Sequence, residues 1–133
     1  MLDRIEKLKE VLSKPKNIVI TTHRGPDGDA MGSSLALYNL LIKSNHSVTV
    51  ITPNDYASFL HWLPGNKNVV EYESSKQTAE DLVNEADVIF MLDFNDVSRI
   101  DGLSKNVKSS NAYKILIDHH QDPQNDIADL IFS

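Results

Sequence analysis

The chain alternates short apolar, β-rich runs with stretches of helical periodicity, and this alternation constrains its fold more than any other feature. Buried strands are predicted at Asn17–Thr22, Ser47–Thr52, Asp87–Leu92 and Tyr113–Ile117, with a shorter one at Val69–Tyr72. Helices are predicted at residues 2–13, about 30–44, from a cap at Thr78 to Ala86, and near 97–103. This order is typical of a three-layer, doubly wound α/β fold, whose mainly parallel sheet of about five strands is flanked by helices.

The second predicted helix is rich in apolar residues along its whole length. Its spacing predicts that one set of side chains faces the core: Leu35, Ala36, Leu40, Leu41 and Ile42. Residues 53–68 are predicted only as a loop-rich segment. The run Ile127–Phe132 predicts one more element that approaches the core, and its position at the chain end suggests a fragment.

Composition excludes several classes of protein. The length of 133 residues fits one domain with a proper core. The absence of cysteine excludes disulfides and thiolate metal sites. A net charge of −6 argues against broad binding to long duplex nucleic acid. No signal peptide is visible, and apolar runs such as Val88–Leu92 are too short to span a bilayer, so we expect a cytoplasmic protein without a membrane partner.

Polar clusters rich in imidazole and carboxylate groups directly follow three of the predicted strands. They are His23–Asp29, Asp93 and Asp118–His120. Because the carboxyl ends of parallel strands lie on one edge of an open sheet, we expect the three clusters to converge there. With little nearby to neutralise them, such groups are stable together only when cations bind among them, and this mixture of ligands suits a divalent metal. The sequence therefore predicts a two-metal hydrolase site.

The first cluster, His23-Arg24-Gly25-Pro26-Asp27-Gly28-Asp29, admits other interpretations when it is considered alone. Its glycines fit neither a dinucleotide-binding G-x-G-x-x-G motif nor a P-loop, and its aspartates would repel a phosphate that no metal accompanies. With metals in between, helix amides near Gly32 and Ser33 could assist a bound anion. Pro-Asp-Gly is also a common turn in any protein. Alone, the motif therefore leaves a turn and a metal site about equally plausible.

The other two clusters are also ambiguous when they are considered singly. Asp93 follows a strand, where aspartate often caps a helix or turn, and Asp96 could compete for the same role. Arg99 is a candidate ligand for a substrate phosphate, although a solvated or ion-paired arginine is more common. His119 and His120 cannot point the same way at a strand end, so one can bind a metal while the other faces another part of the site.

The joint occurrence of the three clusters decides in favour of a metal site. Each cluster stands at the carboxyl end of a different predicted strand, which is improbable as coincidence. His46 and His61 have no such company, and we assign them to surface or core packing.

The motifs resemble the first three motifs of the DHH phosphoesterase superfamily. They are His23-x-x-Pro26-Asp27-Gly28-Asp29-Ala30, the lone Asp93, and Asp118-His119-His120. That superfamily includes RecJ-type exonucleases, family II pyrophosphatases, cyclic-dinucleotide phosphodiesterases and the oligoribonuclease/pAp-phosphatase group. The Pro-Asp-Gly-Asp-Ala segment is most similar to the last group, and the resemblance covers nearly the whole chain.

The resemblance implies a role for each matching residue. His23 and Asp27 would bind one Mn²⁺, Asp29 and His119 would bind the other, and Asp93 would bridge the two ions. Mg²⁺ and Co²⁺ are alternatives to Mn²⁺. His120 would face the substrate phosphate, and Asp118 would support the site without binding a metal.

Two parts of the family pattern are missing. The family has a fourth-motif aspartate beyond Asp-His-His and a second, C-terminal domain that binds the nucleotide portion of the substrate. The chain ends before both, so residues 1–133 are expected to form a truncated phosphoesterase domain that is weak or inactive alone.

The main hypothesis is a Mn²⁺-dependent phosphoesterase that acts on small nucleotides or short oligonucleotides of the pAp type. One alternative is a non-catalytic metal- or nucleotide-binding fragment. Another is a relative of the pyrophosphatases or cyclic-dinucleotide phosphodiesterases. An oxidoreductase is disfavoured by the missing G-x-G-x-x-G motif. Apolar surface at the chain end also raises the prospect of a homodimer.

Overall fold

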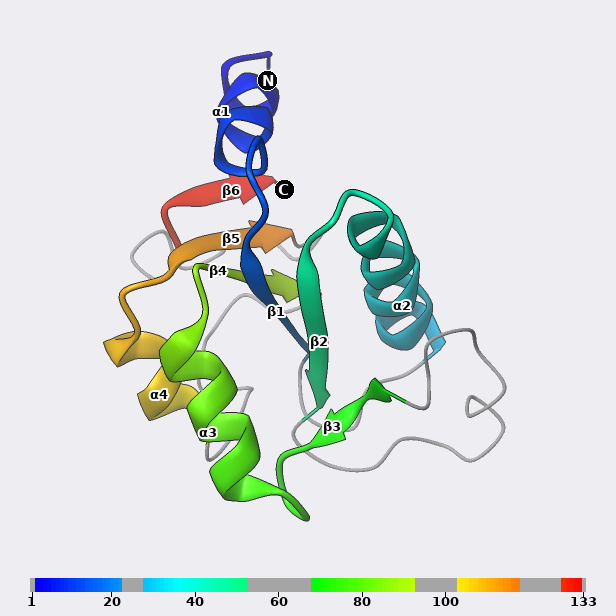
Figure 1. Ribbon diagram of the computed structural model, residues 1–133, viewed down its shortest axis with the longest axis vertical. Helices are drawn as coiled ribbons and strands as arrows, with labels where there is room; N and C mark the ends of the chain where they lie inside the picture. Colours follow the sequence, from blue (N-terminus) through cyan, green and yellow to red (C-terminus); the bar gives the residue numbers. More distant parts are fainter. Residues whose placement is uncertain (1, 23–27, 53–67, 93–102, 118–127, 133) are drawn as a thin grey trace.

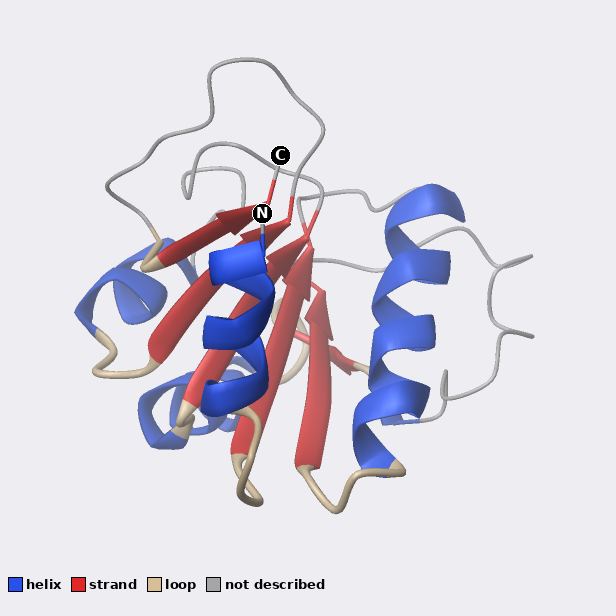
Figure 2. Cartoon of the chain, turned by 90° about the horizontal axis from the view of Figure 1, so that it is seen from above, coloured by secondary structure: helices blue, strands red, loops and turns tan. Residues whose placement is uncertain are grey.

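A computed structural model describes residues 2–22, 28–52, 68–92, 103–117 and 128–132, and they form a six-stranded parallel sheet flanked by helices (Figures 1 and 2). The helices are α1 (Leu2–Val11), α2 (Gly28–Ile42), α3 (Lys76–Glu85) and α4 (Ser104–Ser109). The strands are β1 (Asn17–Thr22), β2 (Ser47–Thr52), β3 (Val70–Glu71), β4 (Val88–Leu92), β5 (Tyr113–Ile117) and β6 (Leu130–Phe132). The predicted doubly wound α/β class is confirmed.

The strand order β3-β2-β1-β4-β5-β6 explains where the helices lie. The chain starts in the middle of the sheet, moves outward to β3, and returns across β1 to β4, β5 and β6. Because crossovers between parallel strands are right-handed, a reversal of direction moves the connecting helices to the other face. Accordingly α2 packs on one face, and α3 and α4 pack on the other. The helix α1, which precedes β1, covers the α2 face near β6 (Figure 1).

The core lies on both faces of the central strands. Ile18 and Ile20 of β1 and Phe90 of β4 pack against α1 and α2, whereas Val19 and Ile89 pack against α3 and α4. Every residue of β4 is buried. Strands covered on both faces need apolar side chains in both directions, which is why these segments read as continuous apolar runs rather than alternating ones.

Several predicted boundaries and the predicted number of strands differ from the structure. The helix α3 begins at Lys76, two residues before the predicted cap Thr78. The helix predicted near 97–103 lies outside the described residues except for Leu103, and the short helix α4 at Ser104–Ser109 was not predicted. Its position follows from Leu103 and Val107, which are four residues apart and both buried beside α3. The predicted sheet of about five strands has six, because the final apolar run forms β6.

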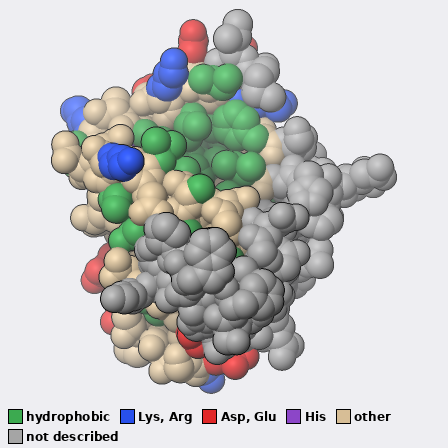
Figure 3. Space-filling model, turned by 90° about the vertical axis from the view of Figure 1, so that its right-hand side faces the viewer, with side chains coloured by type: hydrophobic (Ala, Val, Ile, Leu, Met, Phe, Trp, Pro, Cys, Tyr) green, Lys and Arg blue, Asp and Glu red, His purple; other side chains and the backbone are tan. Residues whose placement is uncertain are grey.

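The predicted inner face of α2 is partly wrong. Leu35 and Leu41 are buried as expected, but Ala36, Leu40 and Ile42 are exposed, Leu40 by 63%. The reason is that α2 has apolar residues on all sides, so periodicity does not distinguish its inner from its outer face. Apolar side chains accordingly gather on the side of the molecule where α2 lies (Figure 3).

None of the described helices is both long and apolar enough to cross a membrane.

Candidate functional site

The last residues of three neighbouring strands form a row across the carboxyl edge of the sheet. Thr22 of β1 is in register with Leu92 of β4, which is in register with Ile117 of β5. The next residues along the chain are His23, Asp93 and Asp118, which lie outside the described residues. One peptide bond, spanning about 3.8 Å between Cα atoms, joins each of them to this row, and neighbouring strands lie about 4.8 Å apart. The three motifs therefore follow adjacent positions on one edge of the sheet.

This edge is also the point where the topology reverses. After β1 the chain continues into α2 on one face of the sheet, and after β4 the next described helix is α4 on the other face. In open α/β sheets, ligands bind outside the carboxyl ends of the strands at such a switch point. The strand order thus places β1 and β4, which precede the first two motifs in the chain, on either side of the preferred ligand position, and β5, which precedes the third, beside β4.

The start of α2 changes one expectation about anion binding. The helix begins at Gly28, two residues earlier than predicted, and Asp29 lies in its first turn. Only the first four N–H groups of a helix lack a partner within it. Gly32 and Ser33 lie beyond these positions, so their backbone amides are engaged within the helix and are not free for an anion. Ser33 is exposed, and a Cβ atom added at Gly32 would have no neighbouring atom within 4 Å.

Most predicted site residues fall outside the described part of the chain. They are His23, Asp27, Asp93, Arg99, Asp118, His119 and His120. Their contacts with metals and substrate stay predictions. The same holds for Asp29, whose backbone is described but whose side chain is not. Within the described ranges, no three His, Asp or Glu side chains come together in a way that could hold a metal ion.

Comparison with known proteins gives the family. The model of the N-terminal domain of the DHH family matches residues 17–133, which include all three motifs and every strand. The chain belongs to the DHH family. Members of this family are phosphoesterases, which supports a hydrolase at the family level.

Two similar proteins are considerably longer than this chain. Cyclic-di-AMP phosphodiesterase GdpP from Bacillus subtilis is 23% identical over 121 residues, which cover 86% of this chain and 18% of GdpP. The crystal structure of an exopolyphosphatase-related protein from Bacteroides fragilis superposes with a TM-score of 0.97 at 41% identity. The match covers 100% of this chain and 39% of the exopolyphosphatase-related protein. The chain therefore spans less than half of either relative.

A third comparison concerns the fold alone. An α-glucosyltransferase, solved with UDP and a 13-mer DNA, matches with a TM-score of 0.67 at 17% identity. The match covers 90% of this chain and 38% of the glucosyltransferase. The DHH chain thus shares its sheet architecture with an enzyme of different chemistry, as expected for a widely used fold.

Two carboxylates of the DHH chain have structural roles at the opposite, amino edge of the sheet. The backbone N–H of Asn17 donates to Asp87 Oδ2 over 2.8 Å, and the N–H of Lys114 donates to Asp129 Oδ2 over 2.9 Å. These bonds satisfy backbone donors at the start of β1 and within β5. Neither carboxylate belongs to the candidate site.

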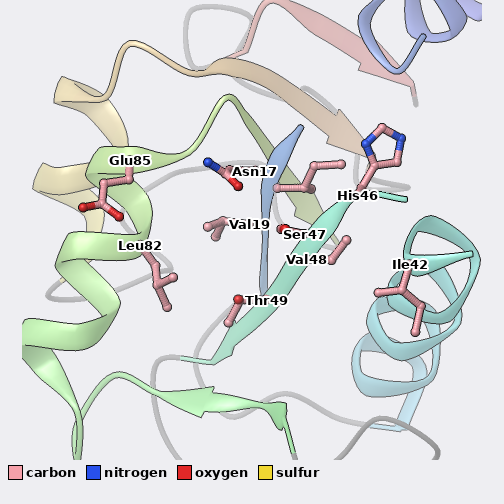
Figure 4. A pocket seen from close by; sticks show the side chains of 10 residues that line it. Asn17, Val19, Ile42, His46, Ser47, Val48, Thr49, Leu82 and Glu85 are labelled. Atoms are coloured by element: carbon pink, nitrogen blue, oxygen red, sulfur yellow. The ribbon is translucent and has the colours of Figure 1, made fainter. Parts of the chain in front are cut away.

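His46, one of the two histidines assigned to packing from the sequence, also lies at the amino edge of the sheet. His46 is buried, and its Nδ1 accepts the backbone N–H of Lys16 over 3.1 Å, which confirms a packing role. His46 and Glu85 line a pocket of about 390 Å³ whose lining contains no lysine or arginine (Figure 4). His61 lies outside the described residues.

Buried hydroxyl groups near the carboxyl edge of the sheet were not predicted from the sequence. Thr21 and Thr52 are fully buried at the carboxyl ends of β1 and β2, and Ser34 is buried on α2. Thr21 Oγ1 donates to the carbonyl oxygen of Phe90 over 3.3 Å. In contrast, Thr52 Oγ1 and Ser34 Oγ have no hydrogen-bond partner among the described residues. The sequence offered little indication that these threonine hydroxyls are buried, because threonine is common in strands of every kind.

Thr21 and Thr52 should respond differently to replacement by valine. Thr52→Val removes an unpartnered hydroxyl and should leave the free energy of unfolding unchanged or raise it by about 1 kcal/mol. Thr21→Val removes a hydrogen bond to Phe90 and should lower it by about 1 kcal/mol. Urea denaturation of both variants measures the difference. A Thr52→Val variant that is less stable than Thr21→Val would show that Thr52 has a partner in solution.

Proposed function

We propose that this chain carries the catalytic centre of a Mn²⁺-dependent two-metal phosphoesterase that acts on small nucleotides or short oligonucleotides. The row formed by Thr22, Leu92 and Ile117 carries the proposal, because His23, Asp93 and Asp118 each follow one of its members. Family membership supports phosphoester hydrolysis as the reaction class.

The residues that follow this row suit divalent metals. His23 and Asp27 would hold one ion, Asp29 and His119 the other, and Asp93 would contact both. Carboxylates mixed with imidazoles favour Mn²⁺ over Mg²⁺, which prefers oxygen ligands throughout. With no cysteine in the chain, thiolate ligation is excluded. Bound ions of this kind supply electrostatic stabilisation of the phosphoryl charge and make a water molecule more acidic.

The remaining polar residues complete the proposed roles. His120 donates a hydrogen bond or a proton to the substrate phosphate, and Asp118 orients its neighbours. Arg99 is a further phosphate ligand through its guanidinium group. Because the chain has a net charge of −6, an anionic substrate would approach only when cations have reversed the local field.

The similarity to GdpP favours a second candidate substrate. GdpP is named as a cyclic-di-AMP phosphodiesterase, so a cyclic dinucleotide is the alternative to pAp and linear dinucleotides. Since the chain spans 18% of GdpP and 39% of the exopolyphosphatase-related protein, low turnover by these 133 residues alone is part of the proposal.

A substrate panel tests the proposal. The metal-free chain is incubated with and without Mn²⁺ and with pAp, a linear dinucleotide, cyclic di-AMP or pyrophosphate, and the products are separated by chromatography. We expect slow, Mn²⁺-dependent hydrolysis of a nucleotide. Mn²⁺-dependent nucleotide binding without hydrolysis would support the alternative of a non-catalytic module. Neither binding nor hydrolysis of any compound would contradict both.

A further inference from the structure

The outer face of α2 is unusual for a surface helix because it lacks charge. No charged residue occurs from Ala30 to Ile42, whereas the buried face of the helix packs Met31, Leu35 and Tyr38 into the core. The exposed residues opposite are Ser33, Ala36 and Leu40, which we define as the α2 outer face. A helix that is apolar on every side is normally covered by another element or another molecule.

The shape of the α2 outer face is complementary to itself. Leu40 projects from the second half of the helix with 63% of its surface exposed. In the first half, Ser33 is small, and the position beside Gly32 is open. These positions are about 12 Å apart along the helix axis at 1.5 Å per residue, and Ala36 lies midway. Two copies related by a two-fold axis at Ala36 would each place Leu40 in the open space of the other.

Charge favours a second copy over an acidic or basic partner. The chain has a net charge of −6, so two copies that approach through most other surfaces repel each other. Their uncharged α2 outer faces add no like-charge contact of their own, so approach through these faces costs less than approach through a charged face. Few charged side chains lie within the apolar area on this side of the molecule (Figure 3).

We propose that the α2 outer face is a homodimer interface in which the α2 helices of two copies pair antiparallel. In this arrangement Gly32 and Ser33 receive the partner's Leu40 instead of binding substrate. One helix from each copy buries less than the 1,200–2,000 Å² of a typical stable interface, so the dimer is weak and depends on protein concentration.

Single cysteines test this arrangement cleanly because the chain has none of its own. A disulfide requires Cβ atoms about 3.5–4.5 Å apart, which the antiparallel pair provides near Ala36 but not at Leu40. Under mild oxidation, the Ala36→Cys variant should form a linked dimer. Asn84→Cys is the matched control, because Asn84 is exposed on α3 at the opposite face of the sheet. Equal linkage of Ala36→Cys and Asn84→Cys, or no linkage, would overturn the proposal.

A second substitution separates specific pairing from chance collision. Leu40→Lys in the Ala36→Cys background should slow disulfide linkage about tenfold by placing a charge at the contact, a change that corresponds to about 1.4 kcal/mol. Because Leu40 is mostly exposed, this variant should keep its circular dichroism spectrum and melting temperature. An unchanged linkage rate would overturn the proposal, as would faster linkage of Leu40→Cys than of Ala36→Cys, which indicates parallel helices.

Discussion

Asp93→Ala should lower phosphoester turnover by about a thousandfold or more while the sheet stays folded. Asp93 follows Leu92, in the central position of the row, and the family resemblance assigns it to both metals. Its loss would remove the shared carboxylate and leave the ions without a fixed separation. The buried residues of β4 all precede it, so the core should not change. Product release with Mn²⁺ present and thermal unfolding measure the two effects separately.

Asp96→Ala is the matched control for this prediction. Asp96 is three residues further along the chain and has the same side chain, but it is not among the predicted ligands. Its replacement should leave turnover within about twofold of the unmodified chain, because Asp96 has no assigned contact with metal or substrate. If Asp96→Ala loses turnover and Asp93→Ala retains it, the assignment of the bridging carboxylate is wrong.

The largest effect on stability is expected for Phe90→Ala. Phe90 is 1% exposed, and on β4 it stands in register with Ile20 of β1 and Ile115 of β5. Its removal would leave a cavity between the sheet and the helices of the α2 face, at a cost of about 3–5 kcal/mol. Single domains are stable by only about 5–15 kcal/mol, so the variant should unfold at much lower urea concentration.

Phe132→Ala supplies the comparison. Phe132 lies on the edge strand β6, is partly buried and packs against the same core. The same change of side chain there should cost about 1–2 kcal/mol, because less apolar surface returns to water. Equal losses at Phe90 and Phe132 would show that β6 belongs to the core as fully as β4 does.

The strands were predictable because they are buried on both faces. The four long apolar runs match β1, β2, β4 and β5 to within one residue, Asp87 being the exception that precedes β4. Helix boundaries were less accurate. Gly28 and Asp29 have low helix propensity, yet both lie at the start of α2, where an acidic residue is favourable. The helix α4 is set by Leu103 and Val107, whose contacts with α3 are tertiary.

The strands that precede the motif residues were predictable, whereas the packing around the carboxyl edge of the sheet was not. The three motifs carry their chemistry in residue types, and the strand order brings the strands that precede them together. The unpartnered hydroxyl of Thr52 depends on packing, which no local pattern encodes. Leu40 was placed in the core because nearly every α2 position is apolar or small, and only the sheet defines which side is inward.

The most direct test of the two-metal site is a calorimetric titration of the metal-free chain with Mn²⁺. We predict two bound ions per chain, the second bound more weakly because the fourth-motif aspartate of the family is not among these residues. The Asp93→Ala variant should bind both ions more weakly. An absence of Mn²⁺ binding, or binding that Asp93→Ala leaves unchanged, would contradict the proposed metal centre.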